Sequence, residues 1–242
     1  MSHSPALLPP PVAALLAVTF PGQPIGAPAP TTGGFSNLSA HVRVGGRPCV
    51  VKAATAPTKR ADLRREALVL ALLRGRRLGA PAPVALAEDG DWSILVTRHR
   101  RGTPGQRLFD WPAPALEPPL HALGRSLARL HRLRLAPPDG AAQAGLLLAE
   151  RAAALAVALA TLPLPGALHD PLRAALAHQG QYAAPPRLVH GDPGLHNVLW
   201  AAPGLTLLDW EFAGWGDPRT DLAWLAWTMR FRALPPRCWQ AL

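Results

Sequence analysis

The stretch 188–199 is Leu-Val-His-Gly-Asp-Pro-Gly-Leu-His-Asn-Val-Leu, and it decides the interpretation of the whole chain. An apolar pair leads into His-Gly-Asp, and Asn197 follows Asp192 five residues later. A second apolar run, residues 205–208, ends at Asp209. Two loops at the ends of adjacent short strands can bring these two carboxylates and the amide together.

These residue types suit phosphoryl transfer. One carboxylate, for which Asp192 is the candidate, can orient an acceptor hydroxyl and accept its proton. The carboxylate of Asp209 and the amide oxygen of Asn197 can hold Mg²⁺, which prefers oxygen ligands and keeps several waters. His190 is predicted to be a packed, hydrogen-bonded scaffold residue, and no role is assigned to His196.

A cation for the nucleotide phosphates is predicted in the first third of the chain. Lys52 ends the run Cys-Val-Val-Lys in the second strand of a predicted hairpin, and Glu66 lies on the predicted helix 61–77, where it can pair with Lys52. Lys52 and Lys59 are the lysines among 25 Lys and Arg residues. Where arginine is the default cation, a lysine in an apolar strand indicates that a compact point charge is needed.

A glycine-containing loop precedes that hairpin. Residues 32–37 are Thr-Gly-Gly-Phe-Ser-Asn, a sequence that can lie over phosphates or simply form a turn. Gly34, Ser36 and Asn37 are therefore candidate nucleotide-binding residues, with turn formation as the alternative.

The predicted order of elements is a small β-rich part with one helix, followed by a helical part with a short β insertion, an α+β arrangement. We expect a loose lead-in with one short helix at 1–30, an N-lobe at 31–97, a hinge at 98–105 and a C-lobe at 106–242. The predicted strands cover about 38–44, 48–53, 84–87 and 93–97, and the later helices cover 116–134, 144–162, 171–179 and 221–232.

The motif resembles the signature of the aminoglycoside phosphotransferase and choline kinase family, relatives of protein kinases. The resemblance rests on His-Gly-Asp with Asn197 five residues later, on Asp-Trp-Glu at 209–211 and on Gly-Asp-Pro-Arg-Thr-Asp-Leu-Ala at 216–223, and it extends over about residues 30–228. It implies a two-lobed protein-kinase-like fold, with ATP and Mg²⁺ as cofactors bound between the lobes.

The resemblance also implies roles for individual residues. Asp192 is the catalytic base, and Asn197 and Asp209 bind Mg²⁺. Asp221 has a structural role, because it ties the catalytic loop in place. Backbone groups at Thr97–His99 meet adenine, so Thr97 and His99 join the predicted nucleotide-binding residues.

The composition limits the other functions. The formal net charge of +10 comes mainly from scattered arginines, without a basic block interleaved with aromatic residues, so we favour a solvated basic surface over a nucleic-acid interface. Cys49 and Cys238 form no disulfide framework, and no stretch has the pattern of a signal peptide or a membrane span. We expect a cytoplasmic protein; a nucleotide-binding pseudokinase and a basic nucleic-acid-binding protein are the alternatives.

The acceptor is predicted only as a class, a small hydroxylated molecule similar to an aminoglycoside, choline or thiamine. Aminoglycosides are polycations, yet no acidic residue occurs in 222–242, which argues against them. Tryptophans are frequent in the same part of the chain. A tryptophan face attracts quaternary ammonium groups, but packing within the core is the interpretation that we favour. The residues concerned are Trp210, Trp215, Trp224, Trp227 and Trp239.

Overall fold

The structure is a computed structural model that describes residues 8–31, 38–143, 145–179, 185–231 and 238. The fold is α+β, as predicted. The chain divides into two compact units. The first unit comprises Met1–Leu108 and Asn197–Glu211, and the second comprises Phe109–His196 and Phe212–Leu242. The boundaries expected for the N-lobe, the hinge and the C-lobe remain a prediction.

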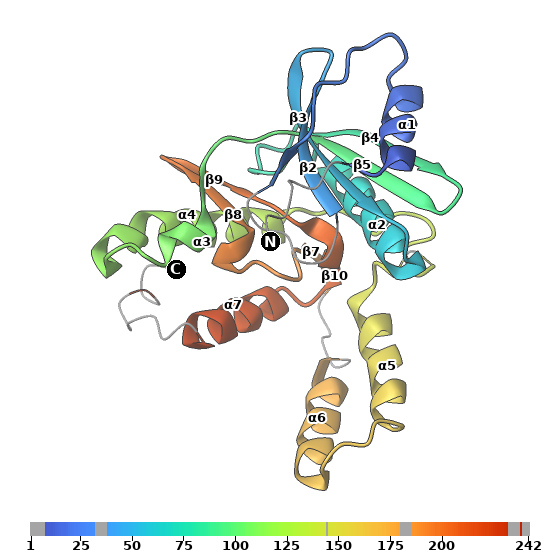
Figure 1. The fold of residues 1–242 in the computed structure, drawn as a ribbon. Coiled ribbons are helices and arrows are strands. Elements are labelled where there is room, and N and C mark those ends of the chain that lie inside the picture. The colour runs from blue at the N-terminus through green and yellow to red at the C-terminus, as the bar shows by residue number, and fades with distance from the viewer. Residues whose placement is uncertain (1–7, 32–37, 144, 180–184, 232–237, 239–242) are drawn as a thin grey trace, which may run out of the picture. The chain divides into compact units, whose positions relative to one another are not determined.

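An antiparallel sheet is the centre of the first unit, with its described strands in the order β1-β2-β3-β5-β4 (Figure 1). The predicted hairpin is present, because β2 and β3 pair from Leu38 opposite Ala53 to Val44 opposite Arg47. Its turn is Gly45-Gly46, where both residues have positive φ, which glycine adopts without strain. The strands of this sheet are β1 (Ala29–Pro30), β2 (Leu38–Val44), β3 (Arg47–Ala54), β4 (Pro83–Asp89) and β5 (Trp92–Arg98).

Helix α2 (Pro57–Leu73) packs on one face of this sheet, through Leu63 against Leu95 of β5. The helix begins and ends about four residues earlier than the pattern predicted. Pro57 occupies the first turn, where its missing N–H is not needed. Gly75 has a φ of 78° just past the last turn, and such a residue ends a helix.

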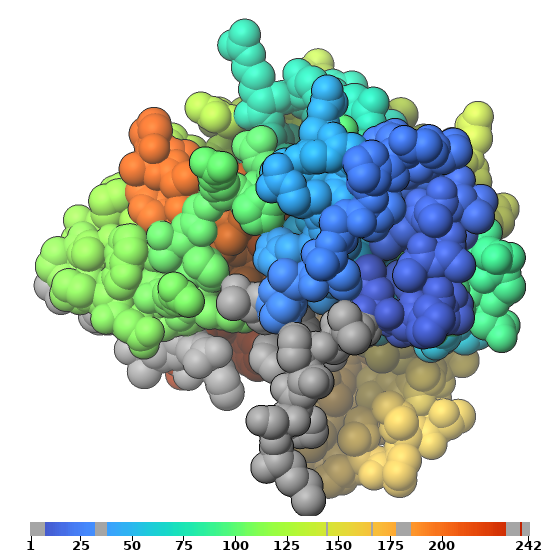
Figure 2. Space-filling model, turned by 45° about the horizontal axis from the view of Figure 1, so that its top comes forward, coloured from blue at the N-terminus to red at the C-terminus, as the bar shows by residue number. Residues whose placement is uncertain are grey.

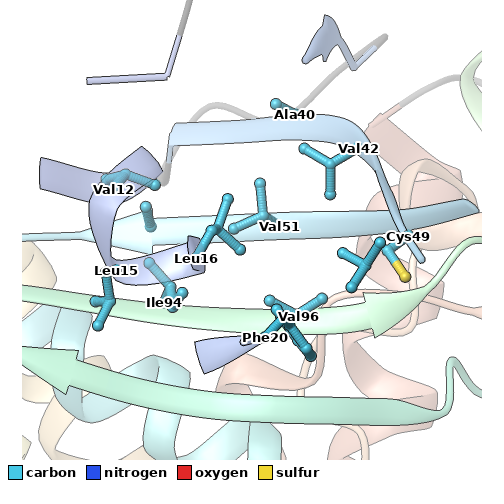
Figure 3. Packing of buried hydrophobic residues seen from close by; sticks show 12 residues of the cluster. Val12, Leu15, Leu16, Phe20, Ala40, Val42, Cys49, Val51, Ile94 and Val96 are labelled. Carbon is cyan, nitrogen blue, oxygen red and sulfur yellow. The ribbon is translucent and has the colours of Figure 1, made fainter. Parts of the chain in front are cut away.

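Helix α1 (Pro10–Thr19) covers the other face of the sheet (Figure 3). Its residues Val12, Leu15 and Leu16 are buried in one apolar cluster with side chains of β2, β3 and β5. In Figure 2, the blue N-terminal segment and the lighter blue strands β2 and β3 form a continuous surface. The segment predicted as a lead-in therefore contributes a helix to the core of the first unit.

A second, smaller sheet in the first unit has the order β6-β8-β9. Gly79, in the connection from α2 to β4, is held against β9: its carbonyl accepts a hydrogen bond from the N–H of Leu207 at 2.6 Å. A Cβ at Gly79 would overlap the carbonyl oxygen of Leu205, so glycine is required there. The elements are β6 (Thr103–Pro104), α3 (Gly105–Leu108), β8 (Val198–Ala201), β9 (Gly204–Leu207) and the 3-10 turn Trp210–Phe212, which continues into the second unit.

The second unit is mainly helical, with β7 and β10 paired antiparallel. Helices α5 and α6 lie side by side (Figure 1). Trp215 of β10 is buried, and its indole N–H donates to the carbonyl of Leu135 at 2.8 Å. The elements are α4 (Ala113–Arg132), α5 (Leu148–Leu159), α6 (Gly166–Gln179), β7 (Arg187–Val189), the 3-10 turn Leu195–Asn197, β10 (Gly214–Gly216) and α7 (Arg219–Phe231).

Helices close to the predicted ranges are therefore present in this unit. None of the helices in the described part of the chain is both long and apolar enough to cross a bilayer.

Candidate active site

Three predicted residues, Lys52, Glu66 and Asp209, meet in the first unit. The Nζ atom of Lys52 lies 2.9 and 2.7 Å from the two carboxylate oxygens of Glu66, and 2.9 Å from Oδ1 of Asp209. Alternation along β3 explains this placement: Val51 and Ala53 point into the α1 side of the sheet, so Lys52 points to the α2 side, where Glu66 lies. The predicted pairing of Lys52 with Glu66 is confirmed.

The positive charge of Lys52 lies between the carboxylates of Glu66 and Asp209. Burial by itself lowers the pKa of the Lys52 ammonium, but the attraction of the Glu66 and Asp209 carboxylates outweighs it and raises this pKa well above its ordinary value. Glu66 is only 2 % exposed, and burial raises the pKa of its carboxyl against the opposing pull of Lys52. Lys52 is thus a fixed positive charge, and a fixed cation is what nucleotide phosphates require.

The hairpin β8–β9 positions the two predicted metal ligands, Asn197 and Asp209. Val198 pairs with Leu207, and the N–H of Leu208 donates to the carbonyl of Asn197 at 2.8 Å, so both ligands lie at the same end of the hairpin. Asp209 has a φ of 61°, a left-handed conformation that is uncommon for residues other than glycine.

The donor atoms at this end of the hairpin fit magnesium. The side chains offer one carboxylate and one amide oxygen, the ligand types that Mg²⁺ prefers, and Mg²⁺ needs few protein ligands because it keeps water and phosphate oxygens. Among the described residues, no cluster of three or more His, Cys, Asp or Glu side chains suits a metal that takes all its ligands from protein. The role of both residues as metal ligands stays a prediction.

Asp192 lies in the second unit, in the loop after β7. Nε2 of His196 lies 3.1 Å from its carboxylate, and the indole N–H of Trp224 donates to its Oδ1. Burial by itself raises the pKa of Asp192, but the hydrogen bonds from His196 and Trp224 lower it, so that the pKa lies below its ordinary value. The carboxylate is therefore ionised and oriented, as a group that accepts a hydrogen bond from an acceptor hydroxyl must be.

Asp221, at the start of α7, ties this loop in place. Its fully buried carboxylate accepts hydrogen bonds from the backbone N–H of His190 at 2.9 Å and of Gly191 at 2.8 Å. Nε2 of His131, near the end of α4, lies 2.8 Å from the same carboxylate. The tie between Asp221 and the loop, which the resemblance implied, is confirmed.

His190 itself is also part of the scaffold. Its side chain is fully buried, and its Nδ1 accepts a hydrogen bond from the N–H of Asp192 at 3.3 Å. Gly191 has a φ of 85°, and a Cβ there would overlap the backbone of Phe212. A packed scaffold histidine was predicted, and this prediction is confirmed.

The remaining predicted residues belong to the first unit. Gly34, Ser36 and Asn37 lie outside the described residues. Thr97 is buried in β5 between β3 and β4. The N–H of His99 donates to the carbonyl of Pro48 at 3.2 Å.

The predicted contact of adenine with residues 97–99 stays a prediction, and a contact through the N–H of His99 requires its bond to Pro48 to open. The side chain of His99 borders a basic hollow of about 350 Å³, which Lys52, Glu66 and Asp209 do not line. Its lining residues are His99, Arg100, Arg101, Ala201, Gly204, Leu205 and Thr206.

Two kinds of contact were not predicted from the sequence. Neither His196 nor Trp224 was expected to contact Asp192; the spacing of four residues between Asp192 and His196 was the available signal. Lys59 was also overlooked: its Nζ lies 3.3 Å from the buried carboxylate of Glu211. Its rarity among the cations, the argument used for Lys52, would have singled it out.

The antiparallel sheet with its Lys–Glu pair, and the His-Gly-Asp loop fixed by a buried aspartate, define the class of protein-kinase-like phosphotransferases. The chain belongs to the phosphotransferase enzyme family, whose model matches residues 29–241. No curated protein matches the chain.

Solved structures agree with the family. An aminoglycoside-3'-phosphotransferase of type VIII is 25% identical, with a TM-score of 0.68 over 95% of this chain and 87% of that chain. A mutant of aminoglycoside 2'-phosphotransferase-IIIa in complex with GDP is 20% identical, with a TM-score of 0.67 over 95% and 83%. A thermostable mutant of the aminoglycoside phosphotransferase APH(4)-Ia, in a ternary complex with ADP and hygromycin B, is 18% identical, with a TM-score of 0.62 over 92% and 80%. The fold is therefore protein-kinase-like, as predicted.

Proposed function

We propose that the protein transfers the γ-phosphate of ATP, with Mg²⁺, to a hydroxyl group of a small molecule. The observation that carries the proposal is the Lys52 ammonium, held by three carboxylate oxygens from Glu66 and Asp209. A strand lysine paired with a helix glutamate, beside an aspartate that follows an apolar strand, is the arrangement that phosphoryl transfer uses.

The reaction follows from the properties of these side chains. The acceptor hydroxyl, hydrogen-bonded to Asp192, attacks the γ-phosphorus, and a new P–O bond forms. The bond from the γ-phosphorus to the oxygen bridging it to the β-phosphate breaks, and ADP leaves with that electron pair. The hydroxyl proton passes to Asp192 and then to solvent. The lowered pKa of Asp192 keeps the carboxylate anionic while it orients the hydroxyl.

The other residues hold the donor. Lys52 neutralises phosphate oxygens, and Glu66 fixes the position of Lys52. Asn197 and Asp209 would hold Mg²⁺, which supplies charge neutralisation of the phosphates when bound. His190 and Asp221 have structural roles, because their bonds are made to the loop itself.

The test compares Asp192→Asn with wild type and with a matched control, Asp170→Asn. The control removes a carboxylate of the same unit whose side chain is 90% exposed. Thermal shift with ATP and Mg²⁺, and ADP release with a panel of hydroxylated acceptors, are measured for all three proteins. We expect Asp192→Asn to keep the ATP-dependent shift and to lose at least about a hundredfold in transfer, and the control to keep both. Transfer at the wild-type rate by Asp192→Asn would refute the role of Asp192.

The same experiment separates the alternatives. Stabilisation by ATP without transfer to any acceptor identifies a nucleotide-binding pseudokinase. If GTP stabilises the protein and ATP does not, the phosphate donor is GTP, and the proposed role of Asp192 toward the acceptor is unaffected. Absence of any nucleotide effect, together with steep salt-dependent binding to DNA or RNA, identifies a nucleic-acid binder and refutes the proposal.

A further inference from the structure

Helix α7 carries two tryptophans that are exposed. Trp224 is 39% exposed and Trp227 is 55% exposed, whereas Trp210 and Trp215 are buried. The expectation that the late tryptophans pack in the core is therefore correct for Trp210 and Trp215 and wrong for Trp224 and Trp227. Trp239 lies outside the described residues. An exposed pair of large aromatic side chains is uncommon on a protein surface unless it serves binding.

The two exposed indoles form a stack, because they are three residues apart on a helix and lie on the same face. Their ring centroids are 5.1 Å apart, and their planes are tilted by 32°. The buried residues of α7 are Asp221, Leu225 and Met229; Trp227 lies on the side of the helix away from them, and Trp224 lies at their edge. The exposed surface of this pair can contact a flat ring of a bound molecule.

This aromatic stack is joined directly to the proposed catalytic base. The indole N–H of Trp224 donates to Oδ1 of Asp192, so the edge of the stack meets the carboxylate that binds the acceptor hydroxyl. A molecule whose ring lies on the stack has its substituents within reach of that carboxylate.

The charges around the stack do not suit a polycation. The acidic residue of α7 is Asp221, which is fully buried and bonded to the catalytic loop. Asp217, just before the helix, is paired with Arg219 at 2.6 Å. Arg230 adds an exposed positive charge to α7. Besides Asp192, neither of these two described carboxylates is available to the ammonium groups of a polycation, whereas a flat, weakly charged ring needs none.

We propose that Trp224 and Trp227 form the acceptor-binding surface, and that the acceptor is a hydroxylated compound with a flat aromatic ring and at most one positive charge. This inference rests on the proposed function and specifies its acceptor. Two indoles from one helix present a single surface rather than a cage around a cation, so they favour stacking on a ring over enclosure of a quaternary ammonium group.

The test uses three probes: thiamine, a flat alcohol with one positive charge; pyridoxine, a flat neutral alcohol; and kanamycin, a polycation. Their phosphorylation is measured by ADP release, and their binding by saturation-transfer NMR. Trp227→Ala removes one ring of the stack without touching the bond from Trp224 to Asp192. Trp227→Phe keeps an aromatic ring, and Leu222→Ala removes a side chain of the same helix with the same 55% exposure.

We expect wild type to bind and phosphorylate at least one flat alcohol better than kanamycin. Trp227→Ala should raise the KM for that alcohol about tenfold, which corresponds to about 1.4 kcal/mol, with kcat much less affected. Trp227→Phe should restore most of the affinity, and Leu222→Ala should leave KM unchanged.

Other outcomes overturn the inference. Transfer to kanamycin that is insensitive to Trp227→Ala, with both flat alcohols inert, leaves the proposed function in place and refutes the aromatic surface. A self-association that Trp227→Ala abolishes while acceptor kinetics are unchanged identifies the stack as a contact between copies. If no probe is phosphorylated, the NMR signal decides: flat-ring binding lost in Trp227→Ala supports the surface, and absence of flat-ring binding refutes it.

Discussion

Removal of the Asp221 carboxylate tests how the catalytic loop is held. The side chain is fully buried and has three hydrogen-bonding partners at 2.8–2.9 Å, of which two are backbone N–H groups and the third is Nε2 of His131. Hydrogen bonds to charged groups contribute about 1.5–3 kcal/mol each, and a buried donor left without a partner costs about 1–3 kcal/mol. Since these values do not add, we expect Asp221→Ala to lower the free energy of unfolding by about 3–5 kcal/mol.

A domain is stable by about 5–15 kcal/mol, so Asp221→Ala can prevent folding, and Asp221→Asn is the better variant. Its amide oxygen still accepts, but its NH₂ group faces a donor, and we expect a loss of about 2–3 kcal/mol. His131→Ala removes one of the three partners and should cost about 1–1.5 kcal/mol.

Urea unfolding measures these losses, and hydrogen exchange of the His190 and Gly191 amides locates them. A loss below about 0.5 kcal/mol in Asp221→Asn, or unchanged protection of both amides, would refute the tie.

Two further predictions concern the first unit. Leu16→Ala should lower the free energy of unfolding by about 2–5 kcal/mol, because this fully buried side chain lies in the core cluster, whereas Val18→Ala, at 77% exposure, should change it by less than about 0.5 kcal/mol in urea unfolding. Equal effects of the two changes would mean that α1 does not pack on the sheet. Gly79→Ala should lower the melting temperature by several degrees, because its Cβ would overlap the backbone of Leu205. Gly204→Ala, where a Cβ meets nothing within 4 Å, should leave the melting temperature unchanged, and a neutral Gly79→Ala would contradict the close approach.

The features predicted from sequence were those that a short local pattern determines. Alternation in β3 fixed the face on which Lys52 lies, and the next helix supplied Glu66 to that face. The spacing around His-Gly-Asp identified the loop, and the aspartate at the start of α7 identified its tie. Phosphoryl transfer requires a paired lysine and a fixed catalytic loop, so the residue types at these positions were enough to predict the Lys52–Glu66 pair and the bond from Asp221 to the loop.

The features that were not predicted from the sequence depend on tertiary packing, that is, on which face of a helix is buried. The apolar residues of α1 show little preference for one face, so the pattern did not reveal that Val12 and Leu16 pack on the sheet. For α7 the signal was present but unused. Asp221, Leu225 and Met229 recur every four residues on its buried side, which places Trp227 on the far side of the helix and Trp224 at the edge of the buried side.

The two lysines of the chain show how composition and structure can be combined. Lys52 and Lys59 both pair with acids of Asp-Trp-Glu at 209–211: Lys52 with Asp209 at 2.9 Å, and Lys59 with Glu211 at 3.3 Å. An ammonium group has three N–H donors, and Lys52 has three carboxylate oxygens within 2.9 Å, from Glu66 on one side and Asp209 on another. A planar guanidinium would engage one carboxylate with parallel bonds and could not meet oxygens that converge from two directions on a single nitrogen. Both lysines thus join a strand or helix of the first unit to the segment proposed to hold the metal, through a carboxylate in each case, whereas Arg65 of α2 reaches the same segment through the backbone carbonyl of Glu211.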